Sequence, residues 1–523
     1  MPGSSIIRFS LRNICRLHRY LTSVQWRRLP PLLTHPKIVI LELLLLGLWL
    51  LTGHGDDSES MTLVWTDKPV EISDAFFGVA IDAAMLTDGE WWSNSDSPPR
   101  PLDFNNPQLI RWTRLLAPDW VRLGGTEADK LWLTQAAEVT PNAPELSRNK
   151  LNQFLNFVSR IKARPFISIS TGPLTRSNGQ WQPEQLQRLL QWLPQDFNGA
   201  LEFGNEPGAH WLIFGRTHQI AFEQLADEYQ QARRLTHAHN IKLAGPANAF
   251  WPEIGEPLKQ LFGSSKDFLT AHANPDIFTW HYYPTQSSRC GVKTESASWD
   301  GLLSIETQRE FEKRSIIIQR WLKQYAPQSH QWLGETGPAQ CGGKAMLTDR
   351  FGSSLWWLSQ LGSAAKYGNE TVIRQSLVGG DYALLGYRRG YSPNPDFWAS
   401  LLWQQNMGAV AFPMAETDGG LRAFAHCHPN RNAVMSVLLV NLNNHNVRIT
   451  LPQMQSGRFL DATSYQLSSR YTLINGVIAA SLSWEEASLP WIQADQWRDM
   501  PAYSYRWVQV DGAEQCLTDE KQG

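Results

Sequence analysis

Short apolar runs alternate with longer amphipathic segments between about residues 76 and 390, and this order constrains the fold more than any other feature of the sequence. Gly, Pro or polar residues bound each run, as is typical of buried strands in a parallel sheet. The segments between the runs, such as KLNQFLNFVSRIKA at 150–163, carry apolar residues at helical spacing. The eight runs are FFGVAID (76–82), DWVRLGGT (119–126), RPFISIS (164–170), GALEFGNEP (199–207), IKLAGP (241–246), DIFTWHYYP (276–284), HQWLGETG (330–337) and TVIRQSLVGG (371–380).

Eight strands alternating with helices predict an α/β fold, a (β/α)8 TIM barrel over residues 76–395. A doubly wound open sheet is the alternative. The barrel is favoured because nearly every run carries its polar or glycine residues at its C-terminal end, where barrel active sites are built.

The sequence pattern changes near residue 400, where β-rich segments and turns replace the alternation of strands and helices. Segments such as NAVMSVLLVNLNN and YSYRWVQV predict a C-terminal antiparallel β-sandwich over residues 396–516, followed by a tail at 517–523. Residues 53–75 are expected to form a linker and a first strand that joins the sandwich.

The N-terminus predicts export. Residues 1–37 hold seven Arg and Lys residues and no acid, and the apolar segment IVILELLLLGLWLLT (38–52) precedes an acidic stretch. A basic flank before an apolar core is typical of an export signal whose basic side stays in the cytoplasm. We expect 38–52 to be either a retained anchor in the inner membrane, with the rest facing the periplasm or the extracellular side, or a cleaved signal of a secreted protein.

Cysteine usage agrees with export. If Cys15 lies on the cytoplasmic side, four cysteines remain, and an oxidising compartment favours their pairing. Four cysteines allow three pairings, among which the spacing does not choose. The net charge of -2 gives no reason to expect a nucleic-acid partner.

Two glutamates stand at matching positions in the predicted barrel. Glu206 ends the fourth run and Glu335 the seventh, so both are expected to face one cleft at the carboxyl ends of the strands. Two carboxylates flanking one bond are what glycoside hydrolysis needs, and 24 tryptophans fit a sugar-binding cleft. Asn205 is placed to bind a sugar hydroxyl. At the end of the sixth run His281 and Tyr283 are placed to orient Glu335 and keep it ionised.

Six motifs, in this order, resemble glycoside hydrolase family 79, the heparanase and β-glucuronidase family of retaining clan A barrels, with this chain as a bacterial-type member. They are AIDAAMLTD, VRLGGTEAD, LEFGNEP, TWHYYP, WLGETGPAQCGG and VIRQSLVGGDY. The resemblance covers about residues 63–516. It implies a proton donor at Glu206, a nucleophile at Glu335, and substrate contacts from Asp82, Thr126, Asn205, Tyr283, Gly342, Gly343 and Tyr382, the last three to a uronic acid carboxylate.

The resemblance also implies a disulfide between Cys427 and Cys516, which leaves Cys290 and Cys341 as a second candidate pair. Cys341 departs from the family, since heparanase has glycine there. The loop after the fifth run departs as well, because it reads GPANAFWPEI, with Phe250 and Trp251 where mammalian heparanase carries a glutamine and paired arginines. Losing those guanidinium groups weakens the case for a sulfated chain.

The expected activity is therefore hydrolysis of β-linked glucuronic acid in a polysaccharide or oligosaccharide. The alternatives are a retaining β-glycosidase acting on a neutral glycan and a non-catalytic carbohydrate-binding relative. No cofactor is expected. No metal is expected either, because the histidines show no paired ligand spacing such as HExxH. We expect a monomer.

Overall fold

The computed structural model of the protein describes residues 59–87, 92, 95–134, 141–251, 255–415 and 419–517. The chain divides into two units, Met1–Ser58 and Glu59–Gly523, and every described residue belongs to the second. The predicted basic region 1–37 and apolar segment 38–52 lie outside the described residues, as does the tail after residue 517. Among the helices of the described part, none has the length and hydropathy required to cross a bilayer.

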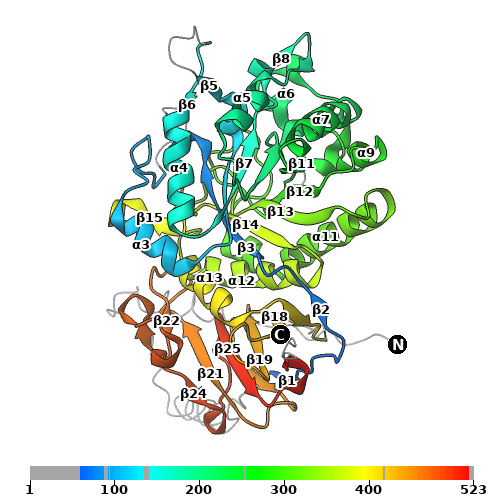
Figure 1. Cartoon of the computed structure of the whole chain (residues 1–523). Coiled ribbons are helices and arrows are strands. Elements are labelled where there is room, and N and C mark those ends of the chain that lie inside the picture. Colours follow the sequence, from blue (N-terminus) through cyan, green and yellow to red (C-terminus); the bar gives the residue numbers. More distant parts are fainter. Residues whose placement is uncertain are drawn as a thin grey trace, which may run out of the picture. The chain divides into compact units, whose positions relative to one another are not determined.

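Eight parallel strands close into a barrel, which confirms the predicted fold and excludes the open sheet (Figure 1). The strands coincide with the eight apolar runs of the sequence. They are β3 (Phe77–Asp82), β4 (Trp120–Gly124), β7 (Arg164–Ile169), β10 (Ala200–Phe203), β11 (Lys242–Phe250), β12 (Ile277–Tyr282), β13 (His330–Thr336) and β14 (Thr371–Gln375). The barrel closes where β14 pairs with β3.

One major helix follows each strand. The eight are α3 (Pro107–Leu116), α4 (Arg148–Arg160), α5 (Glu184–Trp192), α7 (Phe222–His237), α9 (Ser265–Thr270), α11 (Ile305–Tyr325), α12 (Phe351–Lys366) and α13 (Pro395–Asn406). Several begin at side-chain caps that satisfy the first free backbone N–H groups. The side chains of Asn106, Ser147 and Ser304 accept such bonds at the starts of α3, α4 and α11.

Large side chains fill the barrel interior near the amino ends of the strands. Trp332 lies at the centre of this plug, with its ring 4.8 Å from that of Trp120 and 5.4 Å from that of Phe166. Because these residues are near the starts of their strands, the plug closes the amino end of the barrel. The carboxyl end remains available for a site.

The C-terminal domain contains an antiparallel sheet of nine strands, ordered β2-β17-β18-β19-β25-β21-β22-β23 with β24 beside β21. Their bounds are β2 (Val70–Glu71), β17 (Val410–Phe412), β18 (Leu421–Cys427), β19 (Val434–Asn441), β21 (Gly457–Thr463), β22 (Leu473–Ile474), β23 (Val477–Ile478), β24 (Ile492–Gln493) and β25 (Ser504–Asp511). A second layer is formed by β1 (Glu59–Thr62) and β20 (Val447–Thr450), and this pair is parallel rather than antiparallel.

Both faces of the nine-stranded sheet are covered, so all eight residues of β19 are buried. Val437 and Leu439 belong to a core shared with the β20 residues Val447 and Ile449. Leu438, on the opposite face of β19, belongs to the core shared with the barrel helices.

Helix α13 lies where the sequence suggested no helix and where the predicted domain boundary fell. It packs against α3 and α12, so it completes the ring of barrel helices. The helical pattern is weak because ten of its twelve residues are buried, which leaves no polar face to reveal the period. Helix α12 is buried from Phe351 to Ala365 for the same reason. Its Gly362 lies against Phe424 of β18, where an added Cβ would come within 2.4 Å of the ring.

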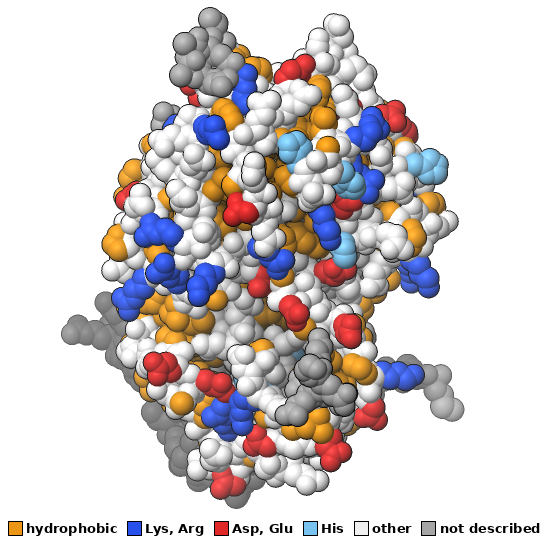
Figure 2. All heavy atoms as spheres, in the orientation of Figure 1, with side chains coloured by type: hydrophobic (Ala, Val, Ile, Leu, Met, Phe, Trp, Pro, Cys, Tyr) orange, Lys and Arg blue, Asp and Glu red, His pale blue; other side chains and the backbone are white. Residues whose placement is uncertain are grey.

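Basic and acidic side chains are scattered over both the barrel and the C-terminal domain on the face shown in Figure 2.

Candidate active site

A cavity of about 440 Å³ lies at the carboxyl ends of the barrel strands. Its position follows from its lining, which includes the last residue of β3, Asp82, and residues at or just after the ends of β4, β10, β11, β12, β13 and β14. Six of the predicted catalytic and substrate-contacting residues line it, namely Asp82, Thr126, Glu206, Tyr283, Glu335 and Tyr382. Four others, Asn205, His281, Gly342 and Gly343, are close in sequence to lining residues but do not line the cavity themselves.

Glu206 stands on a strained turn immediately after β10. Its φ of 51° and ψ of 52° are left-handed, which is uncommon for a residue with a side chain and is found at functional sites. Asp129 holds this turn, because its Oδ2 accepts the Asn205 N–H at 2.9 Å and lies 3.1 Å from His210 Nε2. The Glu206 side chain therefore points into the cavity from a fixed backbone.

The surroundings of Glu206 favour its protonated form. Burial raises the pKa of its carboxyl, and the negative charge of Glu335 raises it further, against opposing hydrogen bonds from His281 and Trp251. The Trp251 indole N–H donates to Glu206 Oε1 at 2.8 Å. A carboxylic acid held in this way can give a proton to a bound substrate.

The surroundings of Glu335 favour its ionised form. Arg122 Nη1 donates to Oε2 at 2.6 Å and the Tyr283 hydroxyl donates to Oε1 at 2.7 Å. Burial alone would raise the pKa of this carboxyl, but the charges of His281 and Arg122 and these two hydrogen bonds lower it overall. The two glutamates therefore have pKa values displaced in opposite directions.

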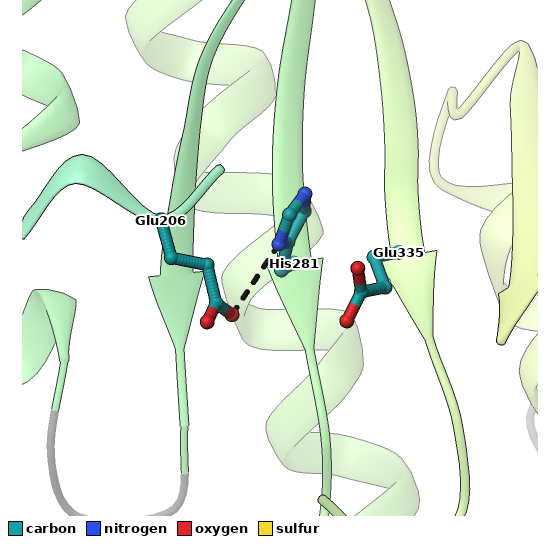
Figure 3. A group of neighbouring side chains, drawn as sticks. All are labelled: Glu206, His281 and Glu335. Carbon is teal, nitrogen blue, oxygen red and sulfur yellow. Dashed lines mark hydrogen bonds and ion pairs between the residues drawn. The ribbon is translucent and has the colours of Figure 1, made fainter. Parts of the chain in front are cut away.

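His281, on β12, lies between Glu206, on the turn after β10, and Glu335, on β13 (Figure 3). One oxygen of Glu206, one oxygen of Glu335 and a ring nitrogen of His281 are all within 4.8 Å of one another. Burial and neighbouring Arg122 lower the pKa of His281, but the carboxylates of Glu335, Glu202 and Glu206 outweigh them and raise it to about 9. The three residue types also suit a metal ion.

Sequence reasoning missed Arg122 and Glu202. Both side chains are fully buried, and Arg122 contacts Glu202 at 2.7 Å and Asn205 Oδ1 at 2.9 Å in addition to Glu335. Burial alone would raise the pKa of Glu202, but Arg122 and His281 lower it to about 2. A signal was present, because a charged residue inside a strand buried on both faces has to be paired.

The remaining predicted residues surround this centre. The Asp82 side chain accepts the Ala84 N–H at 2.9 Å, and it packs so closely on Gly125 that an added Cβ there would lie 2.1 Å from Asp82 Oδ2. The loop after β13 turns through positive φ at Cys341, Gly342 and Gly343, with values of 60°, 78° and 77°. At Gly343 an added Cβ would come within 2.8 Å of the backbone nitrogen of Tyr382, so this glycine lets the loop pack against Tyr382.

The two aromatic residues of the loop after the fifth run, Phe250 and Trp251, have different places. Phe250 is buried in the core with its ring 5.3 Å from that of Trp280, so it is unavailable to a sugar. Trp251 lines the cavity and hydrogen-bonds Glu206. Arg388 and Arg389, which follow β14, do not line the cavity.

Both disulfides are present. Cys290–Cys341 joins the loops after β12 and β13 at the edge of the cavity, and Cys427–Cys516 joins the end of β18 to the C-terminal segment.

Replacing Cys427 and Cys516 together by serine is expected to lower the free energy of unfolding by about 2–4 kcal/mol, because the unfolded chain regains the freedom of a long closed loop. Denaturant titration of the exported protein measures this change. Reducing agent should destabilise the wild type further than the variant, which has one bridge fewer. An unfolding free energy equal to that of the wild type would contradict the prediction.

Comparison with known proteins agrees with this geometry. The family profile described as "Glycosyl hydrolase family 79, N-terminal domain" matches residues 281–362. Heparanase from Rattus norvegicus is 27% identical over 458 residues, covering 75% of this chain and 79% of the relative. Hyaluronoglucuronidase from Hirudo nipponia is 23% identical and covers 82% of this chain and 93% of that protein. The solved 4-O-α-L-rhamnosyl-β-D-glucuronidase from Fusarium oxysporum has a TM-score of 0.59 at 15% identity, with 87% and 100% of the two chains covered, which shows a shared fold.

The fold and these matches define the class of the protein, a retaining glycoside hydrolase built on a (β/α)8 barrel. Within that class, the matches show similarity to glycoside hydrolase family 79 and to heparanase and hyaluronoglucuronidase relatives.

Proposed function

We propose that the protein hydrolyses β-linked glucuronic acid in a polysaccharide or oligosaccharide by double displacement through a covalent glycosyl-enzyme, with Glu206 as proton donor and Glu335 as nucleophile. The observation that carries the proposal is a pair of carboxylates with oxygens within 4.8 Å and pKa values displaced in opposite directions. Retention needs carboxyl groups about 5–5.5 Å apart, whereas inversion needs about 6.5–9.5 Å. The glucuronide is supported by the names of the relatives, heparanase and hyaluronoglucuronidase.

Each residue has a defined part in the two steps. The Glu335 carboxylate attacks the anomeric carbon while the Glu206 carboxylic acid protonates the departing glycosidic oxygen, so one C–O bond breaks and a glycosyl ester forms. Glu206, now ionised, removes a proton from water, whose oxygen attacks the same carbon and releases Glu335. Before the attack, the Tyr283 hydroxyl and Arg122 hold the two oxygens of the Glu335 carboxylate in position.

The uronic acid carboxylate is assigned to the turn at Gly342 and Gly343 together with Tyr382. Consecutive backbone N–H groups in such a turn form a concave site suited to an anion. The contact is through the backbone, so a cysteine at 341 is compatible with it. Tyr382 is buried beside this turn and lines the cavity, which supports its assignment to the sugar carboxylate.

The experiment that tests the proposal compares an aryl β-glucuronide with the matched aryl β-glucoside and β-xyloside. We expect turnover of the glucuronide, with the β anomer as the first product seen by proton NMR. A preference for a neutral glycoside would favour the alternative of a neutral glycosidase. Binding of a glucuronide without turnover would favour a carbohydrate-binding relative.

Tyr382→Phe is expected to lower kcat/KM on the aryl glucuronide about tenfold while changing turnover of the glucoside far less, because the lost hydroxyl leaves the carboxylate with one donor fewer. Tyr387→Phe, outside the cavity, is the matched control and should not change the ratio. Equal losses of kcat/KM on both substrates would mean that Tyr382 shapes the pocket without binding the sugar carboxylate.

The pH dependence of kcat/KM should be bell-shaped. Glu335 has to be ionised, and its pKa lies below the ordinary 4.5, so activity rises with pH through that lower value. Glu206 has to be protonated, and its pKa lies above 4.5, so activity falls as pH rises through it. Glu206→Gln, assayed on an activated aryl glucuronide, should lose the alkaline limb. A limb near pH 9 that persists in this variant would belong to His281.

Disulfides are typical of proteins exported to an oxidising compartment. In the proposed arrangement the apolar segment 38–52 retains the protein at the inner membrane with the barrel outside the cytoplasm, or is cleaved to release a monomer. Cell fractionation and N-terminal sequencing of the exported protein distinguish the two outcomes.

A further inference from the structure

The wall of the cavity nearest Glu206 is apolar. Leu212 and Ile213, in the helix α6 (His210–Ile213) that follows the Glu206 turn, and Trp251 after β11, which bonds Glu206, line the cavity there. Val292, in the loop after β12, adds a further apolar side chain to the lining. Leu212 and Val292 are each 40% exposed, so both present apolar surface at the rim. The structure therefore keeps apolar side chains in contact with solvent on one side of the cavity, where a ligand could cover them.

The opposite wall is polar. It carries Asp82 and Thr126 at the ends of β3 and β4, and Gln375 and Tyr382 at and after the end of β14. In the barrel order these strands lie on the far side of β13 from β10, β11 and β12. The polar side chains of Asp82, Thr126, Gln375 and Tyr382 therefore gather beyond Glu335, and apolar side chains gather beside Glu206. Trp92, which lies against Gly342, and the amides of Gln286 and Gln340 also line the cavity.

The proposed chemistry assigns a sugar to each side. The proton donor has to reach the glycosidic oxygen on the leaving-group side, and Glu206 is hydrogen-bonded to Trp251 of the apolar wall. The uronic acid then occupies the polar side beside Tyr382, and the leaving group lies against Leu212, Ile213, Trp251 and Val292.

The charges of the described lining residues do not favour a site for sulfate. Among the described residues that line it, Lys130 is the one basic side chain, and its Nζ is 2.5 Å from Glu127 Oε1. Arg289 lies nearby, but its guanidinium donates to the Gly343 carbonyl and to Asp381. Sulfate recognition needs charge-assisted donors. A sulfated leaving group would instead lose water against an apolar wall without gaining such donors.

We propose that the leaving-group side of the cavity selects an uncharged group with an apolar face, such as an unsulfated sugar ring or an aryl group, and discriminates against sulfated sugars. This inference rests on the proposed function and specifies its substrate class. Leu212 and Val292 are the specificity-determining residues, because they supply the exposed apolar surface at the rim.

The test uses glucuronic acid β-linked to N-acetylglucosamine, with and without a 6-O-sulfate on the leaving sugar. The two compounds have the same glycosidic bond. The ratio of their kcat/KM values therefore measures how the leaving-group side of the cavity tolerates the sulfate, and not a difference in the bond that is cleaved. We expect the unsulfated compound to be cleaved at least about tenfold faster, since an unpaired buried charge is poorly tolerated.

Leu212→Arg and Val292→Arg supply a cation at the rim and should each lower that ratio about tenfold or reverse it. Both substrates are measured on the same preparation, so a partly folded sample does not alter the ratio. Val64→Arg is the matched control, because Val64 is an apolar residue 44% exposed in the segment after β1 and outside the cavity.

Two kinds of result distinguish failure of the leaving-group selectivity from failure of the proposed glucuronidase activity. Equal or faster cleavage of the sulfated compound by the wild type, or arginine variants that leave the ratio unchanged, would overturn the inference alone, provided that the aryl glucuronide is turned over. No turnover of any glucuronide would overturn the proposed function and the inference with it.

Discussion

Glu206→Ala is expected to hydrolyse an aryl glucuronide about 10²- to 10⁴-fold more slowly, and to recover when azide is added. An activated phenol leaves without a proton, so Glu335 can still form the glycosyl-enzyme. Without a base at position 206, water attacks this ester slowly and the intermediate accumulates on Glu335. Azide needs no base, so it should release the sugar as the β-glycosyl azide. Mass spectrometry of the trapped enzyme and NMR of the product measure both effects.

The companion variants make this result specific. Glu335→Ala has no nucleophile and should be inactive on the same substrate, and any azide product should have the α configuration. Glu127→Gln removes another carboxylate that lines the cavity, and azide should not affect its rate. If azide instead rescues Glu335→Ala to the β product, the roles of the two glutamates are reversed.

The barrel could be predicted because its strands are encoded locally. Each strand is an apolar run that ends in glycine or polar residues, and most helices between them show one apolar face. The predicted glutamates followed from the same rule, since strand number alone places Glu206 and Glu335 at one rim. Helix α13 was not predicted because it shows no single apolar face. The barrel and the C-terminal sheet together bury most of its circumference.

The network behind the glutamates could not be predicted in this way. Arg122 and Glu202 belong to strands that are not neighbours in the barrel, and only closure and register bring them into contact. The hydrogen bond from Trp251 to Glu206 likewise depends on the path of the chain after β11. Such contacts are set by three-dimensional neighbours and leave no period or spacing in the sequence.

Arg122→Met is expected to cause the second large loss, because one guanidinium serves Glu335, Glu202 and Asn205 at once. Removing one partner of a buried ion pair leaves an uncompensated charge and costs about 3–5 kcal/mol of unfolding free energy. Activity should fall by about 10²-fold or more, a loss comparable with removing one donor that stabilises transition-state charge.

The pH dependence of kcat/KM distinguishes a role of Arg122 in the active site from a merely structural role. Arg122 lowers the pKa of Glu335, so its removal raises that pKa, and the nucleophile becomes ionised only at a higher pH. The acid limb of kcat/KM should therefore move upward in Arg122→Met. Arg176→Met is the matched control, since Arg176 also forms a buried bidentate pair, with Glu228, away from the cavity. It should lose stability while keeping the acid limb of the wild type. If the two variants lose stability alike and neither limb moves, Arg122 holds the barrel together without setting the charge of Glu335.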